Sequence, residues 1–223
     1  MKDIPIFTGQ FGMASLILRE IPVKNCAYVM VRDAQRGQLR AFLEECRQAC
    51  SLAGADHILV TAEEPIDFLP HIHDMLELAC RKSGLPPVWE PVAVTRVTEE
   101  LGSRFLRHYN ALFRDIPNAA TYYQADVDRI LKQERAYLAS VQGEVAGIGE
   151  VTDKELCAIG VLPPFRGLGE RLALTLLREI SAEEVTLRVS SSNVPALRLY
   201  EKLGFSRRRV LSRWYGLAGF TGE

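Results

Sequence analysis

The sequence predicts an α/β protein of the α+β kind, in which a mixed central sheet is flanked by helices and preceded by a smaller α/β domain. Three observations support this prediction. Residues 156–180 read as a strand, a glycine turn and an amphipathic helix. Residues 184–204 read as an alternating strand and a capped helix, and residues 12–80 carry a separate strand and helix pattern. Strands that alternate with helices are typical of a sheet covered by helices.

The first of these stretches has the features of an anion site. The apolar run of residues 156–162 ends at two prolines, and a turn containing Arg166, Gly167 and Gly169 follows. The next apolar residues recur every four positions, as on one face of a helix: Leu168, Leu172, Leu176 and Ile180. The first N–H groups of such a helix lack internal partners and favour a phosphate. An ordinary strand-to-helix turn explains the same residues equally well.

The downstream pattern decides between these interpretations. Residues 184–190 alternate as a strand, Asn193 can cap the next helix, and Pro195 suits its first turn. The order V-x-P-x-F-R-G, helix, strand, N-x-x-A-x-x-x-Y-x-x-x-G-F resembles the GNAT superfamily of acetyl-CoA-dependent N-acetyltransferases. The resemblance extends over residues 88–219, and its specific part lies within residues 156–205.

The resemblance implies a GNAT-like fold, acetyl-CoA as co-substrate and an amine acceptor. It assigns Tyr200 as the general acid near the sulfur, while Asn193 contacts the cofactor or caps its helix. The cofactor-binding residues it implies are Ile159, Val161, Arg166, Gly167, Leu168, Gly169, Glu170, Arg171, Asn193 and Tyr200. Arg171 departs from the family pattern, because it replaces a small residue. It could swing out and pair with a phosphate, or it could crowd the turn.

The base cannot be chosen from sequence alone. Glu150 closes one expected strand and Glu155 opens the next, so both are candidate catalytic bases. A raised pKa in an apolar cleft would distinguish one of them. Cys157 could act as an acyl relay, but we expect a buried thiol and direct transfer. Tyr122 and Tyr123 could line the acceptor site or simply pack.

Composition excludes several other functions. The chain has 223 residues, is 48% hydrophobic, and nearly balances 27 basic with 28 acidic residues. We therefore expect no nucleic-acid partner, although residues 207–209 are three arginines that form a solvated patch or contact a CoA phosphate. The N-terminus lacks a signal-peptide pattern and no apolar run approaches the ~18 residues of a membrane span, so we expect a cytoplasmic protein.

Neither disulfides nor a metal site is expected. The five cysteines are odd in number and lack paired spacing, and Cys46 with Cys50 would share the core face of a helix. His71 and His73, even with His57, do not make a metal site without further ligands at defined spacing.

We place the domain boundary between residues 1–84 and residues 85–223. The first part reads as strands at residues 13–21, 26–31 and 57–61, with helices around residues 39–50 and 68–80. Residues 29–37 can be laid on residues 159–167, so that Arg36 and Gly37 match Arg166 and Gly167. The N-terminal domain is then a degenerate half-length copy of the later fold, without a cofactor, or the likeness is accidental.

The second part begins with elements that agree with the family resemblance. After a linker at residues 85–87, we expect a strand at residues 88–97 and a helix capped by Thr98. A short helix around residues 127–131 follows, and then a hairpin across Gln142-Gly143.

We therefore expect an N-acetyltransferase that moves an acetyl group from acetyl-CoA to a primary amine of a small molecule or peptide. The alternative is a CoA-binding pseudoenzyme or sensor. A third interpretation is an unrelated α/β protein whose glycine turn holds another phosphate ligand. The sequence specifies neither the acceptor nor whether the protein forms a homodimer.

Overall fold

The structure is a computed structural model that describes residues 4–116, 118–133 and 135–219. The chain divides into two compact units: residues 1–75 with 210–223, and residues 76–209. Strands β5 (His71–Arg81) and β11 (Ser206–Ala218) both run through the division, so each unit contains part of both. The domain boundary that we placed between residues 84 and 85 stays a prediction.

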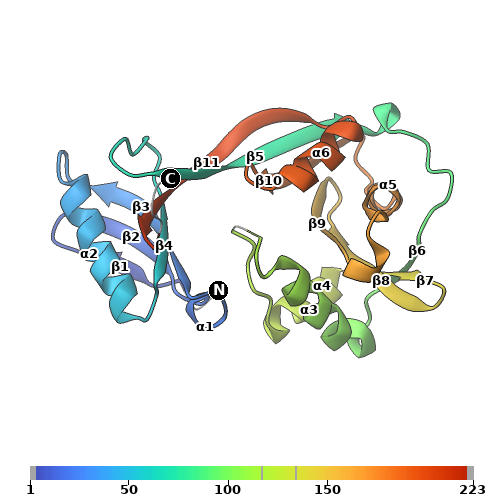
Figure 1. Cartoon of the computed structure of the whole chain (residues 1–223), viewed down its shortest axis with the longest axis horizontal. Coiled ribbons are helices and arrows are strands. Elements are labelled where there is room, and N and C mark those ends of the chain that lie inside the picture. The colour runs from blue at the N-terminus through green and yellow to red at the C-terminus, as the bar shows by residue number, and fades with distance from the viewer. Residues whose placement is uncertain (1–3, 117, 134, 220–223) are drawn as a thin grey trace. The chain divides into compact units, whose positions relative to one another are not determined.

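The first unit is a small mixed sheet with one long helix. Its elements are β1 (Ile6–Thr8), β2 (Gly12–Ile17), α1 (Ile21–Lys24), β3 (Cys26–Ala34), α2 (Leu39–Leu52) and β4 (His57–Thr61). The strand order is β1-β2-β3-β4-β11, with β3 and β4 parallel and the other pairs antiparallel. Helix α2 packs on this sheet (Figure 1), and its buried residues are Phe42, Leu43, Cys46 and Cys50, so the two cysteines share the core face as expected.

The second unit contains the glycine turn. In chain order after β5 come η1 (Lys82–Gly84), β6 (Ala93–Arg96), α3 (Glu99–Phe113), α4 (Gln124–Gln133), β7 (Ala136–Val141), β8 (Glu144–Val151), β9 (Glu155–Val161), η2 (Pro163–Phe165), α5 (Gly169–Arg178), β10 (Glu184–Ser190) and α6 (Val194–Lys202). The strand order is β5-β10-β9-β8-β7-β6. Strands β6 to β9 pair antiparallel, whereas β9 and β10 are parallel. The predicted mixed sheet flanked by helices is confirmed.

Alternating residues of β8 show how the helices cover this sheet. Added Cβ atoms at Gly147 and Gly149 would touch Leu172 and Leu176 of α5, so these two glycines let α5 approach one face. Ile148, between them, belongs to a core shared with Phe105 of α3. Helices α3 and α4 contact each other and cover the opposite face (Figure 1).

The helix predicted around residues 68–80 is wrong. This segment is strand β5, in which Leu76, Leu78 and Cys80 are buried at a spacing of two residues. Leucine, methionine and glutamate favour helices in isolation. Pairing of β5 within the sheet overrides that preference, because it buries every second side chain and satisfies the backbone.

The two units share one order of strands. In the first, β2 and β3 are antiparallel and β3-α2-β4 makes a parallel connection; in the second, β8, β9, α5 and β10 repeat this order. Gly37 and Gly167, which the sequence alignment paired, both have positive φ angles of 77° and 98°. These agreements support the half-repeat hypothesis, which a superposition of residues 26–62 on 156–190 would test.

The same comparison shows one difference. Strands β3 and β4 stay paired over five residues, from Cys26–His57 to Met30–Thr61. Strands β9 and β10 pair only at Glu155–Thr186 and Leu156–Leu187 and then part.

Among the described residues, no helix has the length and apolar character that crossing a membrane requires.

We expect Gly147→Ala to lower the free energy of unfolding by about 1–3 kcal/mol, as overpacking typically does. Its Cβ would lie 2.5 Å from the Gly160 carbonyl oxygen, and a strand backbone cannot move aside cheaply. Urea denaturation measures the change. The control is Gly84→Ala, whose Cβ would meet no atom within 4 Å, and it should change stability by less than about 0.5 kcal/mol. Equal stability of the two variants would contradict this packing.

Candidate active site

The turn between β9 and α5 exposes unpartnered backbone amides. The first bond inside the helix runs from the Leu172 N–H to the Leu168 carbonyl, at 2.9 Å. Within the described residues, the N–H groups of Gly169, Glu170 and Arg171 have no backbone acceptor. An added Cβ at Gly167 would meet nothing within 4 Å. Three free donors and an open turn at a helix N-terminus therefore form a candidate anion site.

The two arginines near this turn differ in their side-chain partners. Arg166 is exposed and has no partner among the described residues. Arg171 reaches back to the segment before β6, where its Nε donates to the Glu90 carbonyl at 2.9 Å and its Nη2 lies 3.2 Å from the Glu90 carboxylate. Of the two alternatives for Arg171, the side chain swings out, but its partner in this structure is Glu90.

The edge of β9 that leads to this turn lies where β9 and β10 stop pairing. Beyond Leu156, the edge of β9 that faces β10 has no ladder partner in the described chain, while its other edge pairs with β8. Ile159 and Val161 lie on this stretch and are half-buried. The predicted cofactor residues of β9 and of the turn therefore line one continuous feature: an open strand edge that leads to the amides of α5.

A bulge in β9 brings the acidic candidates onto one face. Glu150 of β8 opposes Ala158, and Val151 opposes Leu156, so Cys157 is an extra residue. A bulge of this kind interrupts the alternation of side chains. Ala158 consequently joins the core under α3, on the face that Glu150 also occupies, and Cys157 and Glu155 precede it on that face.

Glu150 is a buried carboxylate with two partners. Its side chain is 7% exposed, the Tyr122 hydroxyl donates to it at 2.8 Å, and Arg129 lies 3.8 Å away. Burial raises the pKa of Glu150, against the opposing effects of Tyr122 and Arg129. This is the sign that distinguishes a candidate base, so the structure favours Glu150 over Glu155 for that role.

Tyr122 is held in place by α3. The Asn110 side chain donates to the Tyr122 carbonyl and accepts from its N–H, both at 2.8 Å. The rings of Tyr109 and Tyr122 stack with centroids 3.7 Å apart. Burial raises the pKa of Tyr122, so its hydroxyl stays a donor to Glu150. Sequence reasoning missed Asn110 and Arg129, because a single helical asparagine or arginine carries no recognisable spacing. Tyr123 is exposed.

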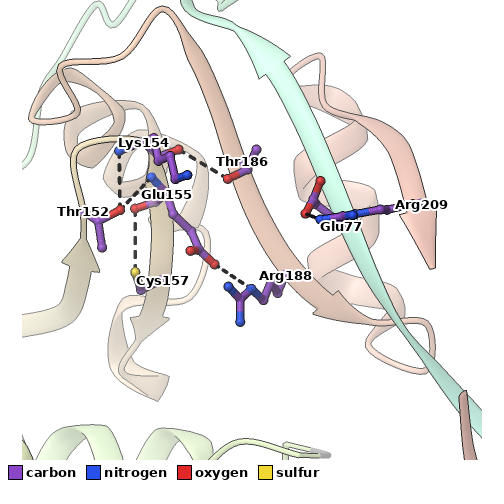
Figure 2. A network of polar contacts seen from close by, with 8 residues as sticks. All are labelled: Glu77, Thr152, Lys154, Glu155, Cys157, Thr186, Arg188 and Arg209. Carbon is purple, nitrogen blue, oxygen red and sulfur yellow. Dashed lines mark hydrogen bonds and ion pairs between the residues drawn. The ribbon is translucent and has the colours of Figure 1, made fainter. Parts of the chain in front are cut away.

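Glu155 and Cys157 lie on β9, next to the point where β9 and β10 separate (Figure 2). Arg188 of β10 reaches across to Glu155, with 3.1 Å between its Nε and the carboxylate, and Thr152 accepts from the Glu155 N–H at 3.0 Å. Cys157 is exposed, so the prediction of a buried thiol is wrong: it is the extra residue of the bulge, and its neighbour Ala158 takes the buried position. Partial burial and the carboxylates of Glu150 and Glu155 raise the pKa of the thiol to about 12.

Helix α6 supplies the remaining candidates. Asn193 caps it, its side chain accepting from the Ala196 N–H at 3.3 Å. Lys202 forms an ion pair with Glu170 on α5. Tyr200 is 7% exposed and packs edge-on against Phe205. Within the described residues its hydroxyl has no hydrogen-bond partner, and burial raises the pKa of Tyr200 to about 12.

The arginine run at residues 207–209 is not simply a solvated patch. Arg208 bonds Glu184 at 2.8 Å, and Arg209 bonds Glu77 of β5 at 3.0 Å, as Figure 2 shows for the latter pair. These contacts tie β5 and β10 to β11.

Among the described residues, no group of three or more His, Cys, Asp or Glu side chains is arranged to hold a metal ion.

The predicted site residues therefore fall into three groups. The turn residues from Arg166 to Arg171 gather at the start of α5. Glu150 and Glu155 share the face under α3 and α4. Asn193 and Tyr200 belong to α6, where the former caps the helix and the latter packs against its end.

Comparison with known proteins agrees with this arrangement. The family model described as FR47-like protein matches residues 137–214. A mycothiol acetyltransferase of Thermomonospora curvata is 31% identical over 210 residues, covering 81% of this chain and 64% of its own length, so the chain spans less than two thirds of that relative. A GCN5-related N-acetyltransferase from Kribbella flavida shares the fold, with 15% identity, a TM-score of 0.62, and coverage of 99% of this chain and 91% of that one.

A shorter relative is covered more completely. The N-alpha-acetyltransferase of Sulfurisphaera tokodaii is 35% identical over 123 residues, which are 45% of this chain and 73% of that protein. Since the match includes most of that relative, and the fold has the parted strands and the glycine turn, the chain belongs to the GNAT superfamily of acetyltransferases.

Proposed function

We propose that this protein transfers an acetyl group from acetyl-CoA to a primary amine of a small molecule or peptide by direct transfer. The observation that carries the proposal is the edge of β9 left unpaired by β10, which runs to the three free amides of α5 and lies next to a buried carboxylate on β8. The names of the relatives include both small-molecule and N-alpha acetyltransferases, which supports an amine acceptor without choosing between these classes.

The residues present fit the diphosphate and the pantetheine arm of CoA. The N–H groups of Gly169, Glu170 and Arg171 would bind the diphosphate, and exposed Arg166 would add a positive charge. The open edge of β9 offers backbone donors and acceptors to an extended chain with amide groups. When bound, acetyl-CoA supplies the thioester carbon that the amine attacks.

Two side chains would manage the protons. In the transfer, the amine nitrogen forms the new C–N bond while the C–S bond breaks. Glu150, whose carboxylate is oriented by Tyr122, would take the amine proton, directly or through water. Tyr200 would give a proton to the leaving sulfur, and its raised pKa keeps that proton in place at neutral pH.

Direct transfer is favoured over an acyl relay through Cys157. A cysteine nucleophile acts as the thiolate. With its pKa raised to about 12, Cys157 is almost entirely protonated at neutral pH. The flanking carboxylates that raise it would also oppose formation of the anion.

The test of the proposal is turnover with acetyl-CoA and a panel of amines, measured as thiol release and as the mass of the acetylated product. Acetylation of at least one amine is the expected result. Calorimetric binding of CoA without acetylation of any amine would favour the CoA-binding pseudoenzyme instead. Absence of CoA binding would contradict both.

We expect Arg166→Ala to weaken CoA binding about tenfold, as loss of an exposed charge-assisted contact does. Arg171→Ala should weaken it by less than about threefold, because its guanidinium is already bound to Glu90. Isothermal titration calorimetry with CoA compares the two variants. A larger loss in Arg171→Ala would show that this side chain leaves Glu90 for the phosphates.

Glu150→Gln should lower kcat/KM by about 10²–10⁴, the usual contribution of a positioned base. The same variant should be more heat-stable than the parent at pH 7. A carboxyl with a raised folded-state pKa stabilises the fold only below its unfolded pKa, and this stability is lost as the pH rises through the folded pKa. Glutamine avoids the loss, so the gain in melting temperature should shrink toward zero as the pH falls below about 4.

Glu144→Gln on the same strand is the matched control for this experiment. Glu144 is exposed, and its replacement should change the melting temperature and activity little. Full activity of Glu150→Gln would contradict the assignment. So would a melting-temperature gain over the parent that is smaller at pH 7 than at pH 4.

Tyr200→Phe should lower kcat about 100-fold while leaving the dissociation constant of CoA within about threefold. The fold should survive, because the hydroxyl has no hydrogen-bond partner among the described residues. Steady-state kinetics with calorimetry separates the two effects. Tyr137→Phe, which removes a hydroxyl of β7 bonded to Glu179, is the control expected to keep kcat within about twofold. Unchanged kcat in Tyr200→Phe would exclude it as the acid.

A further inference from the structure

Arg188 presents an unused guanidinium edge on the reactive face. Its side chain is 65% exposed, and only its Nε is engaged, with the Glu155 carboxylate at 3.1 Å. Within the described part of the chain, its two terminal nitrogens have no protein partner. Figure 2 shows Arg188 and Glu155 pointing toward each other from β10 and β9. The ion pair therefore orients the guanidinium and leaves its outer edge free.

The position of Arg188 is set by the sheet. Val185, Leu187 and Val189 of β10 are buried toward α5, so Arg188 projects from the opposite face. Leu187 is the last β10 residue paired with β9, and Arg188 follows at the point where the strands part. Glu155 and Cys157 project from the same face of β9. The free guanidinium edge thus lies one strand away from the site where the acetyl group would be transferred.

The charges on this face are arranged in two parts. Glu150 and Glu155 are carboxylates on the β8 and β9 side, where an ammonium group would be attracted before it loses its proton. Arg129 also lies on this side, but it already contacts Glu150, and its guanidinium lies over the Tyr122 ring, 6.0 Å from the centroid. Arg188, on the β10 side, is a more exposed cation with open donors. A ligand with an amine and a nearby anion would match both parts.

We propose that Arg188 binds a carboxylate of the acceptor, and that the acceptor is a small amine with a carboxylate a few bonds from its nitrogen, as in an α-amino acid. This inference rests on the proposed acetyl transfer and specifies its substrate class. A guanidinium forms two parallel hydrogen bonds with a carboxylate, and Glu155 holds the plane in which they form. Arg188 is accordingly a specificity-determining residue, whereas Glu150 and Tyr200 carry the proton transfers.

The test uses matched acceptors that differ only in the carboxylate. The twenty proteinogenic L-amino acids and their C-terminal amides are compared in the full-length protein saturated with acetyl-CoA, with release of the CoA thiol as the readout. The amides have the more acidic ammonium group and so more neutral amine at pH 7.5, which would favour them without a carboxylate site. We expect at least one amino acid to be used with a kcat/KM at least tenfold above that of its amide.

The variants separate recognition from structure. Arg188→Gln should raise KM for the preferred amino acid about 10–100-fold, change kcat by less than about threefold, and leave the amide unaffected. Arg188→Lys should recover part of the loss, since it keeps the charge without the fork. Lys154→Gln removes an exposed charge at the neighbouring β8–β9 turn and should retain the preference. The dissociation constant of CoA, measured by calorimetry, should be the same in all four proteins.

Binding is measured in parallel as the thermal shift of the CoA-saturated protein with each acid and amide. Greater stabilisation by an acid than by its amide, lost in Arg188→Gln, supports the assignment. It is overturned if no acid exceeds its amide in either assay, or if Arg188→Gln loses acids and amides equally. Failure of the wild-type protein to bind CoA is a separate outcome, which contradicts the proposed acetyl transfer itself.

Discussion

The parting of β9 from β10 after two paired residues is the constraint on which the site depends. Parallel strands normally stay hydrogen-bonded along their length, and β3 with β4 does so over five residues in the first unit. Where β9 and β10 separate, a strand edge and the beginning of α5 become accessible together. Without that separation, the free amides at the glycine turn would remain an anion site, but no extended ligand could run from them toward Glu150.

The bulge at Cys157 works with this separation. By inserting one residue into β9, it places Glu155, Cys157 and Ala158 on the face that Glu150 occupies. In the proposed reaction, β9 would thereby offer an edge to the cofactor and a face to the acceptor. The two carboxylates on this face have partners from other elements: Tyr122 and Arg129 contact Glu150 of β8, and Arg188 contacts Glu155 of β9. Loss of these partners would leave carboxylates in partly apolar surroundings, which is costly.

The sequence predicted well what rests on local patterns. The helical stripe from Leu168 to Ile180 and the cap at Asn193 are properties of neighbouring residues, and both are seen. Residues 68–80 were mistaken for a helix, because only pairing within the sheet makes them a strand. Glu150 and Glu155 are equal candidates for the base in the sequence. Their different surroundings depend on Asn110, Arg129 and Arg188, which are distant in sequence and carry no local signal. Arg171 was recognised as a departure, but its partner Glu90, 81 positions away, was not foreseeable.

In the proposed complex, the first turn of α5 binds the diphosphate of CoA at the end of the open β9 edge. A crystal structure of the protein with CoA would show this contact. We expect diphosphate oxygens within hydrogen-bond distance of the N–H groups of Gly169, Glu170 and Arg171, and the thiol arm lying between β9 and β10. Electron density for CoA elsewhere, or β9 and β10 closed together along their whole length in that structure, would contradict it.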